Sequence, residues 1–429
     1  MKKKYRIILY TSIFLLCVVA SIILVVKKSN SVYEEESKPK VVKHKSMLSM
    51  NLEQTAGAGD YKTVTQSKWP TEGYKFNAEL SRCENGSTLS WDDTKKAVIV
   101  SGNLSDKCYV YFDIYQPTLA EYIKSQYTGT QGENNIYYHD SDLTNGAGDN
   151  SYRYAGANPN NFVCFGSDTS PCPTDNLYRI IGVFGENYHG VTGKQLVKLI
   201  KYDYMTTDEL GTDGDYSQTY KEWGMDSTYK GTYGDGERIG VYYWNYKATG
   251  SATNTWSTSL LNKTNLNTNF INNIGTTWAN KIATVTWKVG GNTYANISDV
   301  VPATTYQNEI VNPVTTNTTD NATTYSAKIG LMYVSDYGFA ASPDAWTLTM
   351  SSYNNTTATN NNWMYMGLYE WTISRRAGYS DRAFFVYHDG YVDYYYVYNG
   401  IGVRASFSLE SSVSYVSGSG SMSDPIVIN

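Results

Sequence analysis

A run of twenty residues without a charge, residues 7–26, constrains this chain more than any other feature. The run is mostly apolar, and about 20 apolar residues in a helix are enough to cross the hydrocarbon core of a bilayer. Four Lys and Arg precede the run and two Lys follow it. Because basic residues favour the cytoplasmic side, we expect a single-pass anchor at the cell membrane, formed by residues 1–28, with the rest of the chain outside. A cleaved signal peptide is the alternative, although no small-x-small cleavage site follows the run.

Charge and composition narrow the function classes for the remaining chain. The formal net charge is −5, and residues 1–28 hold six basic residues and no acid, so the rest of the chain carries −11. Such a body repels a phosphate backbone, and no basic stripe occurs outside the N-terminal segment, so we expect no nucleic-acid partner. Tyrosine contributes 41 of the 429 residues, whereas charged residues are only 17%. This composition is too aromatic for a disordered chain and is typical of a strand-rich, loop-rich protein of two or three domains.

Four cysteines outside the apolar run fit an extracellular location. They allow three pairings, and their spacing favours Cys83 with Cys108 and Cys164 with Cys172. Four free thiols are the alternative. Zinc is disfavoured, because the chain has no CxxC and no His with a Cys or His neighbour at ligand spacing.

Turn signals and periodicity divide the chain after the apolar run. Residues 29–60 are charged and lack periodicity, which predicts a tether. Residues 61–116 alternate short apolar runs with turns, which predicts a small β-module closed by Cys83–Cys108. Residues 117–429 follow as the main domain. There, residues 118–127 and 255–275 have helical spacing, with Gly275 as the expected end of the second, and LYRIIGVF followed by QLVKLIKYDY predicts a buried hairpin.

Two acidic loops carry the oxygen ligands that calcium takes. These are DSDLTNGAGD at 140–149 and GTDGDY at 211–216. Neither has the EF-hand spacing, and Asx-turns explain both loops more simply. Structural calcium therefore stays an alternative, and we expect no other metal and no cofactor.

The C-terminal part contains two short motifs, YEWTIS at 369–374 and GVRASF at 402–407. A Glu370–Arg404 ion pair and a packed Trp371 would lock the ends of a loop-rich domain, with Gly402 as a further structural residue in the closing strand. In order and distance the motifs resemble the end of the C-type-lectin-like fold in its formylglycine-generating-enzyme-like branch. The resemblance implies an α+β fold class: a loop-rich C-type-lectin-like domain with mixed strands and few helices, preceded by the disulfide-stapled β-module and the transmembrane helix. The oxidase activity is not implied, because the chain lacks the late cysteine pair that holds copper.

A closer resemblance extends over roughly residues 60–429. Three segments are similar to segments of anchored surface proteins of gut Firmicutes: CFGSDTSPCPTDNLYRIIGVFGE, AKIGLMYVSDYGFAASP and SGSGSMSDPIVIN. The same branch includes the variable proteins of diversity-generating retroelements, in which a C-terminal patch is rewritten on a fixed scaffold. That resemblance implies a variable face at about 371–409, although Ala405 departs from the G-V-R-P ending of relatives. The implied ligand-binding residues are Arg376, Tyr379, Ser380, Asp381, Arg382, Phe385, Tyr387, His388, Asp389, Asp393, Tyr394, Tyr395, Tyr396, Tyr398 and Asn399.

GYVDYYYVYNG, residues 390–400, is the most tyrosine-rich stretch of that face. Tyrosine provides a large amphipathic contact area at low entropic cost, and binding loops of antibodies use it for this reason. As one strand, the stretch would place Tyr394, Tyr396 and Tyr398 on one side and Asp393 and Tyr395 on the other. The sequence therefore favours an adhesin or receptor-like protein for an extracellular protein or glycan ligand. The alternative is that these tyrosines fill an ordinary core.

A second function class uses the acids of the same region. Glu370, Asp381, Asp389 and Asp393 could supply the paired carboxylates of a surface enzyme acting on glycans or cell wall. We expect binding rather than catalysis, because acids near turns are usually just solvated. A template repeat matching codons 371–409 beside a reverse-transcriptase gene would favour the first class. Sugar hydrolysis lost on changing Glu370 or Asp389 would favour the second.

Overall fold

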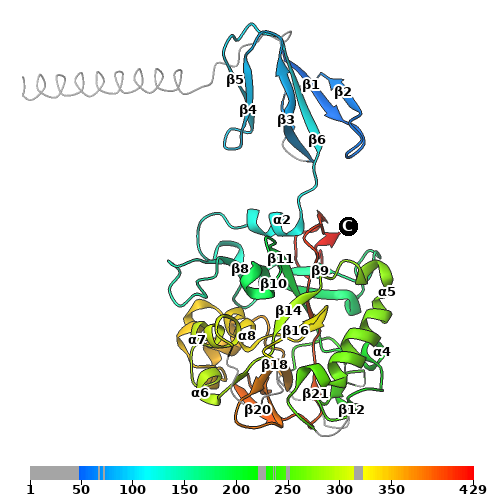
Figure 1. Cartoon of the computed structure of the whole chain (residues 1–429), viewed down its shortest axis with the longest axis vertical. Coiled ribbons are helices and arrows are strands. Elements are labelled where there is room, and N and C mark those ends of the chain that lie inside the picture. Colours follow the sequence, from blue (N-terminus) through cyan, green and yellow to red (C-terminus); the bar gives the residue numbers. More distant parts are fainter. Residues whose placement is uncertain are drawn as a thin grey trace, which may run out of the picture. The chain divides into compact units, whose positions relative to one another are not determined.

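The computed structural model describes residues 48–65, 68–70, 73–220, 229–234, 236, 238–247, 252–313 and 322–429. The predicted membrane run, residues 7–26, lies outside these ranges. Within them, no helix combines the length and the apolar character needed to span a membrane. The chain divides into two compact units, the first ending at Tyr115 and the second beginning at Gln116 (Figure 1).

The first unit is a small β-structure. Its sheet has the order β2-β1-β6-β3, in which β1 and β6 run parallel and the other neighbours antiparallel, and β4 and β5 form a separate hairpin. The strands are β1 (Leu48–Glu53), β2 (Tyr61–Val64), β3 (Tyr74–Cys83), β4 (Thr88–Asp92), β5 (Ala97–Ser101) and β6 (Cys108–Ile114). β1 lies within the range that the sequence analysis assigned to the tether, so the sheet begins earlier than expected. Its apolar side chains Met50 and Leu52 share a core with Val110 and Phe112, and this packing overrides the charged composition around them.

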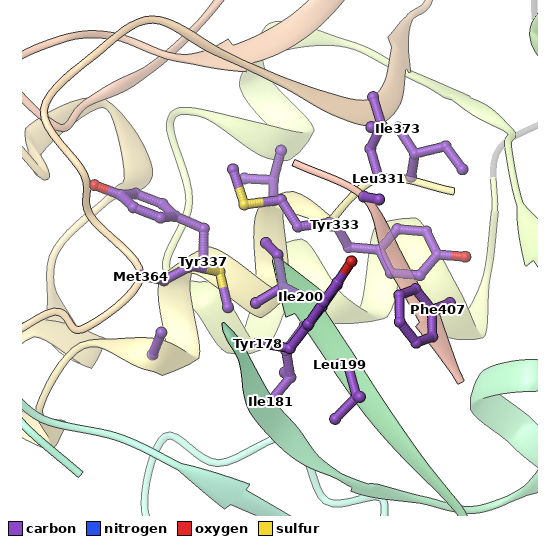
Figure 2. Close-up of a cluster of buried hydrophobic side chains, with 14 of the residues drawn as sticks. Tyr178, Ile181, Leu199, Ile200, Leu331, Tyr333, Tyr337, Met364, Ile373 and Phe407 are labelled. Carbon is purple, nitrogen blue, oxygen red and sulfur yellow. The ribbon is translucent and has the colours of Figure 1, made fainter. Parts of the chain in front are cut away.

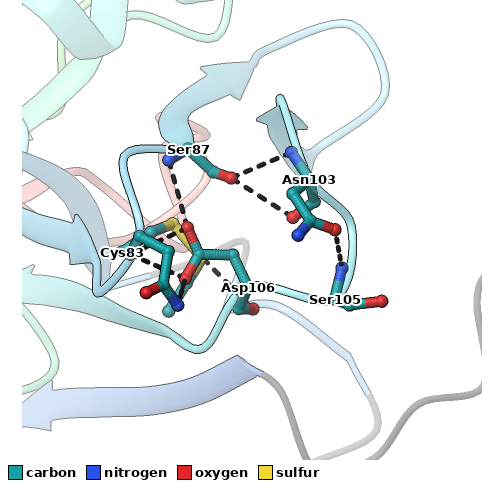
Figure 3. Close-up of a disulfide and its surroundings, with 7 residues drawn as sticks. Cys83, Ser87, Asn103, Ser105 and Asp106 are labelled. Atoms are coloured by element: carbon teal, nitrogen blue, oxygen red, sulfur yellow. Dashed lines mark hydrogen bonds between the residues drawn. A yellow bond between two sulfur atoms is a disulfide. The ribbon is translucent and has the colours of Figure 1, made fainter.

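One disulfide joins the two strands that carry Cys83 and Cys108. The two residues lie opposite each other in the register of β3 and β6. Beside the bond, the Asp106 carboxylate accepts the Ser87 amide at 3.1 Å, and the Ser87 hydroxyl accepts the Asn103 amide at 3.0 Å (Figure 3). Cys164 and Cys172 form the second disulfide in the other unit. Both predicted pairings are confirmed.

The second unit contains two larger sheets and two small ones. The first sheet has the order β17-β22-β11-β10-β8-β7 with β9 paired to β10, and the second has β12-β13-β21-β18-β19-β20 with β15 paired to β18. The strands are β7 (Ile136–His139), β8 (Ser151–Tyr154), β9 (Phe162–Cys164), β10 (Leu177–Phe184), β11 (Leu196–Lys201), β12 (Tyr216–Thr219), β13 (Gly240–Tyr242), β14 (Val285–Lys288), β15 (Gly291–Asn292), β16 (Thr324–Ala327), β17 (Ile329–Gly330), β18 (Glu370–Arg376), β19 (Arg382–Val386), β20 (Val392–Tyr396), β21 (Ile401–Gly402), β22 (Ser406–Ser408), β23 (Tyr415–Ser417) and β24 (Val427–Ile428). The pairs β14–β16 and β23–β24 form the two small sheets. The predicted hairpin is β10 and β11, which pair antiparallel.

The helices of the second unit are short. They are α2 (Leu119–Ser125), α3 (Glu186–His189), α4 (Thr207–Leu210), α5 (Ile271–Ala279), α6 (Tyr294–Ile297), α7 (Pro302–Tyr306), α8 (Val334–Ala340) and α9 (Thr356–Asn360). Tighter 3₁₀ turns occur at Glu133–Asn135, Thr174–Asn176, Trp256–Thr258, Pro343–Thr347 and Met350–Ser352, and wider π turns at Leu261–Phe270 and Gln307–Val311. The described chain is therefore a mixed α+β protein, rich in strands.

Both helical predictions are confirmed. Thr118 and Glu121 cap the start of α2 reciprocally, which explains why the helix begins there. Gly275 has non-helical backbone angles, with φ 76° and ψ 164°, so the helical segment predicted at 255–275 ends there as expected, and a second short helical turn follows to Ala279. The turn beyond it is held because Trp278 packs edge-on against Phe165, with ring centroids 5.0 Å apart.

The core of the second unit forms around β10 and β11, in which every residue is buried. Burial on both sides explains the continuous apolar run that the sequence shows there. Figure 2 shows Tyr178 and Ile181 of β10 and Leu199 and Ile200 of β11 facing Tyr333, Tyr337 and Phe407. This core supports the sheet that ends in β20.

Candidate ligand-binding face

The predicted binding residues lie on three neighbouring antiparallel strands, β18, β19 and β20, and in the turns that follow each of these strands. β20 is the last strand of its sheet and pairs only with β19. In their register, Arg382 is opposite Tyr396 and Phe384 is opposite Tyr394. Cross-strand partners point to the same side of a sheet, so the side chains of Arg382, Tyr394 and Tyr396 share one side. The strand ends at Tyr396, so Tyr398 belongs to the turn that follows. The prediction that Tyr398 is part of the strand is therefore wrong.

On this side, two arginines lie between tyrosine rings. The guanidinium carbon of Arg376 is 3.5 Å from the ring centroid of Tyr394 and 4.1 Å from that of Tyr379. Those two rings are nearly parallel, at an angle of 15°. Arg382 lies 4.5 Å from the rings of both Tyr379 and Tyr396, and its Nη2 donates to the Tyr396 hydroxyl at 3.0 Å. Both distances are typical of cation–π contacts.

The stack continues through further tyrosines. Tyr396 stacks on Tyr398 with centroids 4.9 Å apart, and Tyr398 contacts Tyr246 at 6.3 Å. We call the continuous surface the Arg–Tyr face, made of Tyr246, Arg376, Tyr379, Arg382, Tyr394, Tyr396 and Tyr398. Tyr294 packs edge-on against Tyr394 at its other end.

Exposure separates this face from the tyrosines elsewhere. Among the described residues, the exposed tyrosines are Tyr246 (49%), Tyr379 (45%), Tyr395 (42%) and Tyr398 (38%). Three of them belong to the Arg–Tyr face, and the fourth projects from the reverse side of β20. Every other described tyrosine is buried or half-buried. The exposed tyrosines of the described chain are therefore gathered on or beside β20, whereas the others are buried or half-buried.

The positive charge of the face is only weakly compensated. Within the described ranges Arg376 forms no ion pair, and its Nε and Nη1 atoms are buried without a hydrogen-bond acceptor. Arg382 Nε approaches Asp381 Oδ1 at 3.8 Å. The aromatic rings, rather than carboxylates, thus hold both guanidinium groups in place.

Asn254 fixes the loop that carries half of the Arg–Tyr face. It is buried, and its Nδ2 lies 2.7 Å from the carbonyl oxygen of Arg376 and 2.8 Å from those of Tyr379 and Arg382. Its backbone amide donates to the Ser380 carbonyl at 2.5 Å. One side chain therefore closes the turn between β18 and β19 from behind. The sequence analysis missed Asn254, as it missed Tyr246.

The reverse side of β20 is an aromatic cluster rather than a second free surface. Phe385, predicted to bind ligand, is only 3% exposed, which corrects that assignment. It packs between Tyr369, Trp371, Tyr387 and Tyr395, with centroids 5.6–6.1 Å away. His388 and Tyr387 both contact Tyr369 from the edge of the cluster.

The remaining predicted residues differ in exposure. Ser380 is exposed, whereas Asp381, Asp389, Asp393 and Asn399 are half-buried. Burial raises the pKa of Asp393, against the hydrogen bond that its carboxylate accepts from the Tyr394 amide at 2.8 Å. Asp389 Oδ1 is buried with no hydrogen-bond partner among the described residues.

The predicted lock beside the face is present. Arg404 Nε donates to Glu370 Oε1 at 2.8 Å, and both side chains are at most 3% exposed. The indole of Trp371 is fully buried and donates to the Tyr242 carbonyl at 2.9 Å. A Cβ at Gly402 would lie 2.8 Å from the ring of Tyr204, so glycine allows this close approach. Glu370, one of the acids considered for catalysis, is thus committed to Arg404 inside the protein.

The two acidic loops use their carboxylates locally. Asp140 Oδ1 accepts the amides of Asp142 and Leu143, as in an Asx-turn. Asp213 accepts from the Asn269 side chain, and Asp215 accepts the amides of Leu260 and Leu261. In the described part of the chain, no three His, Cys, Asp or Glu residues are arranged to hold a metal ion.

Comparison with known proteins adds no further evidence: no family model, no curated protein and no solved structure matches this chain.

Proposed function

We propose that this chain is a membrane-anchored extracellular binding protein whose Arg–Tyr face contacts the ligand. The observation that carries the proposal is that the exposed tyrosines of the described chain lie on or beside β20. Isolated exposed aromatic residues need no explanation, but a group of them around fixed arginines has the composition of an interface centre. Tyrosine and arginine are also the residues that most often dominate binding energy.

The charge of the face indicates the kind of ligand. Within the described ranges Arg376 forms no ion pair, and Arg382 pairs with Asp381 at 3.8 Å, whereas the chain beyond residue 28 is acidic overall. A protein or glycan ligand with hydrogen-bond acceptors or acidic groups would complement the two guanidinium groups. The uncharged run 7–26 and its basic flanks support an anchor that keeps this face outside the cell.

The fold and the origin of the tyrosines belong to the same proposal. We infer a C-type-lectin-like domain of the formylglycine-generating-enzyme-like branch, in which a retroelement rewrites about 371–409. The buried Glu370–Arg404 pair and Trp371 support this idea, because they are buried residues that stabilise the sheet and are not exposed on the Arg–Tyr face. Asn254 lies outside the rewritten range and holds the loop backbone whatever side chains the loop carries.

The test compares three versions of the chain displayed on intact cells. A face variant carries Tyr379→Ser and Tyr398→Ser. A control variant carries Leu104→Ser and Val416→Ser. These substitutions remove two exposed apolar side chains outside the Arg–Tyr face, which are 60% and 44% exposed. Each is incubated with the same labelled panel of secreted proteins and glycans.

We expect at least one member of the panel to bind the unmodified chain and the control variant, and to bind the face variant at least about tenfold more weakly. If every ligand found binds the face variant as tightly as the control, the face is not the binding site.

A further inference from the structure

A polar pocket lies in the second unit and shares no residue with the Arg–Tyr face. Its volume is about 200 Å³, and its walls come from α2, the turn Glu133–Asn135, β8 and the loops at residues 160 and 419. The side chains that matter here are Tyr122, Gln126, Asn134, Asn135, Tyr154 and Asn160. No residue that lines the pocket carries a charge, so the wall offers amides and hydroxyls but no ion.

Tyr154 contributes to the wall of the pocket. The residue is 4% exposed, and its hydroxyl is not among the fully buried groups that lack a hydrogen-bond partner. Burial raises the pKa of Tyr154, so the hydroxyl keeps its proton. A protonated hydroxyl in the wall of a pocket can both donate a hydrogen bond to what fills the pocket and accept one from it.

The ring of Tyr122 is held rigidly at the same pocket. It stacks on Tyr415 with centroids 3.6 Å apart and an angle of 6° between the rings. It belongs to α2, whose start is fixed by the capping box of Thr118 and Glu121. An aromatic ring that cannot turn offers a flat apolar surface beside the polar groups.

Two neighbouring asparagines are held in an uncommon backbone conformation. Asn134 and Asn135 have φ values of 56° and 58°, in the left-handed region. Such conformations cost free energy and are concentrated at functional sites. The Asn134 side chain donates to the Gln126 carbonyl at 2.9 Å. Two consecutive asparagines of the turn thus line the pocket.

We propose that this pocket binds one residue of an uncharged sugar. Sugar hydroxyls both donate and accept hydrogen bonds, as do the amides and hydroxyls of the wall. The apolar side of a sugar ring can lie on Tyr122. A uronic acid or a phosphorylated sugar would bring a charge for which the wall has no cation.

The experiment is saturation-transfer NMR on the full chain. The probes are the methyl glycosides of glucose, galactose, mannose and N-acetylglucosamine, with glucuronic acid as the charged comparison. We expect at least one neutral glycoside to bind, and glucuronic acid to bind at least about tenfold more weakly.

Tyr154→Phe removes only the hydroxyl from the pocket wall, so it should leave the melting temperature nearly unchanged and weaken the neutral glycoside at least about tenfold. Asn160→Ala is the second variant, because Asn160 is exposed and has ordinary backbone angles. Tyr178→Phe, another buried tyrosine, is the matched control and should bind normally.

The proposal is overturned if none of the four neutral glycosides binds, or if binding is unchanged in both Tyr154→Phe and Asn160→Ala. Binding that persists in the Tyr379→Ser/Tyr398→Ser face variant is expected here, so this result and that of the proposed function are independent.

Discussion

Replacing Arg404 with methionine should lower the free energy of unfolding of the second unit by about 3–5 kcal/mol. The substitution leaves the Glu370 carboxylate buried, without the guanidinium group that now lies 2.8 Å from it. It also removes the donor to the Met364 carbonyl, at 2.6 Å. Denaturant unfolding followed by tryptophan fluorescence measures the effect, since Trp371 follows Glu370 in β18 and is fully buried in the folded state.

The unfolding free energy of Arg404→Met should also depend on pH, which gives a second test of the ion pair. Burial raises the pKa of Glu370, and Arg404 opposes this effect. Without Arg404 the pKa rises further, so the folded state keeps a proton that the unfolded state releases. The unfolding free energy of Arg404→Met should therefore fall as the pH rises above the usual range of a glutamic acid.

The double variant Glu370→Gln/Arg404→Met is the control, because it leaves no buried charge. It should be clearly more stable than Arg404→Met alone. Equal stability of the two variants at neutral pH would show that the ion pair does not lock this part of the domain.

Replacing Asn254 with aspartate should cost about 2–4 kcal/mol, because carboxylate oxygens would then face the carbonyl oxygens of Arg376, Tyr379 and Arg382. The side chain keeps its shape and loses only its N–H donors. Backbone amides of residues 377–381 should exchange hydrogen for deuterium faster, since the loop loses its support. Ligand binding at the Arg–Tyr face should weaken even though no residue of the face has changed.

Asn254→Ala separates two effects of the aspartate substitution: the loss of the N–H donors and the repulsion between the new carboxylate and the carbonyl oxygens. It leaves the carbonyl oxygens unpaired but adds no negative charge, so it should destabilise less than the aspartate. If Asn254→Asp is as stable as the unmodified chain, Asn254 does not hold the loop through its amide.

Some of this arrangement could be predicted from the sequence. The two disulfides follow from cysteines that are close in sequence, and α2 follows from the helical spacing of apolar residues in 118–127. The Glu370–Arg404 pair was inferred from two motifs, because a buried glutamate and arginine near one another need each other as partners. These features depend on short-range patterns or on strong physical constraints.

Other features depend on contacts that no local pattern shows. No sequence pattern around Asn254 distinguishes it from an ordinary loop asparagine, and only the fold places it behind the turn at Tyr379. The strand alternation alone does not show that Phe385 is buried. The ring of Tyr395, from β20, packs against Phe385, and so does the ring of Tyr369. Tyr398 continues the tyrosine pattern, yet the strand ends before it, because Val397 turns into the core.

The binding isotherm of Tyr398→Ala, measured with a ligand found in the capture experiment, tests the central claim most directly. The account predicts a loss of about 2 kcal/mol or more in binding, roughly 30-fold in Kd. The same variant should unfold within about 0.5 kcal/mol of the unmodified chain, because its side chain is exposed. Affinity that is unchanged, or a loss of several kcal/mol in unfolding free energy, would contradict the claim that this tyrosine is displayed for binding.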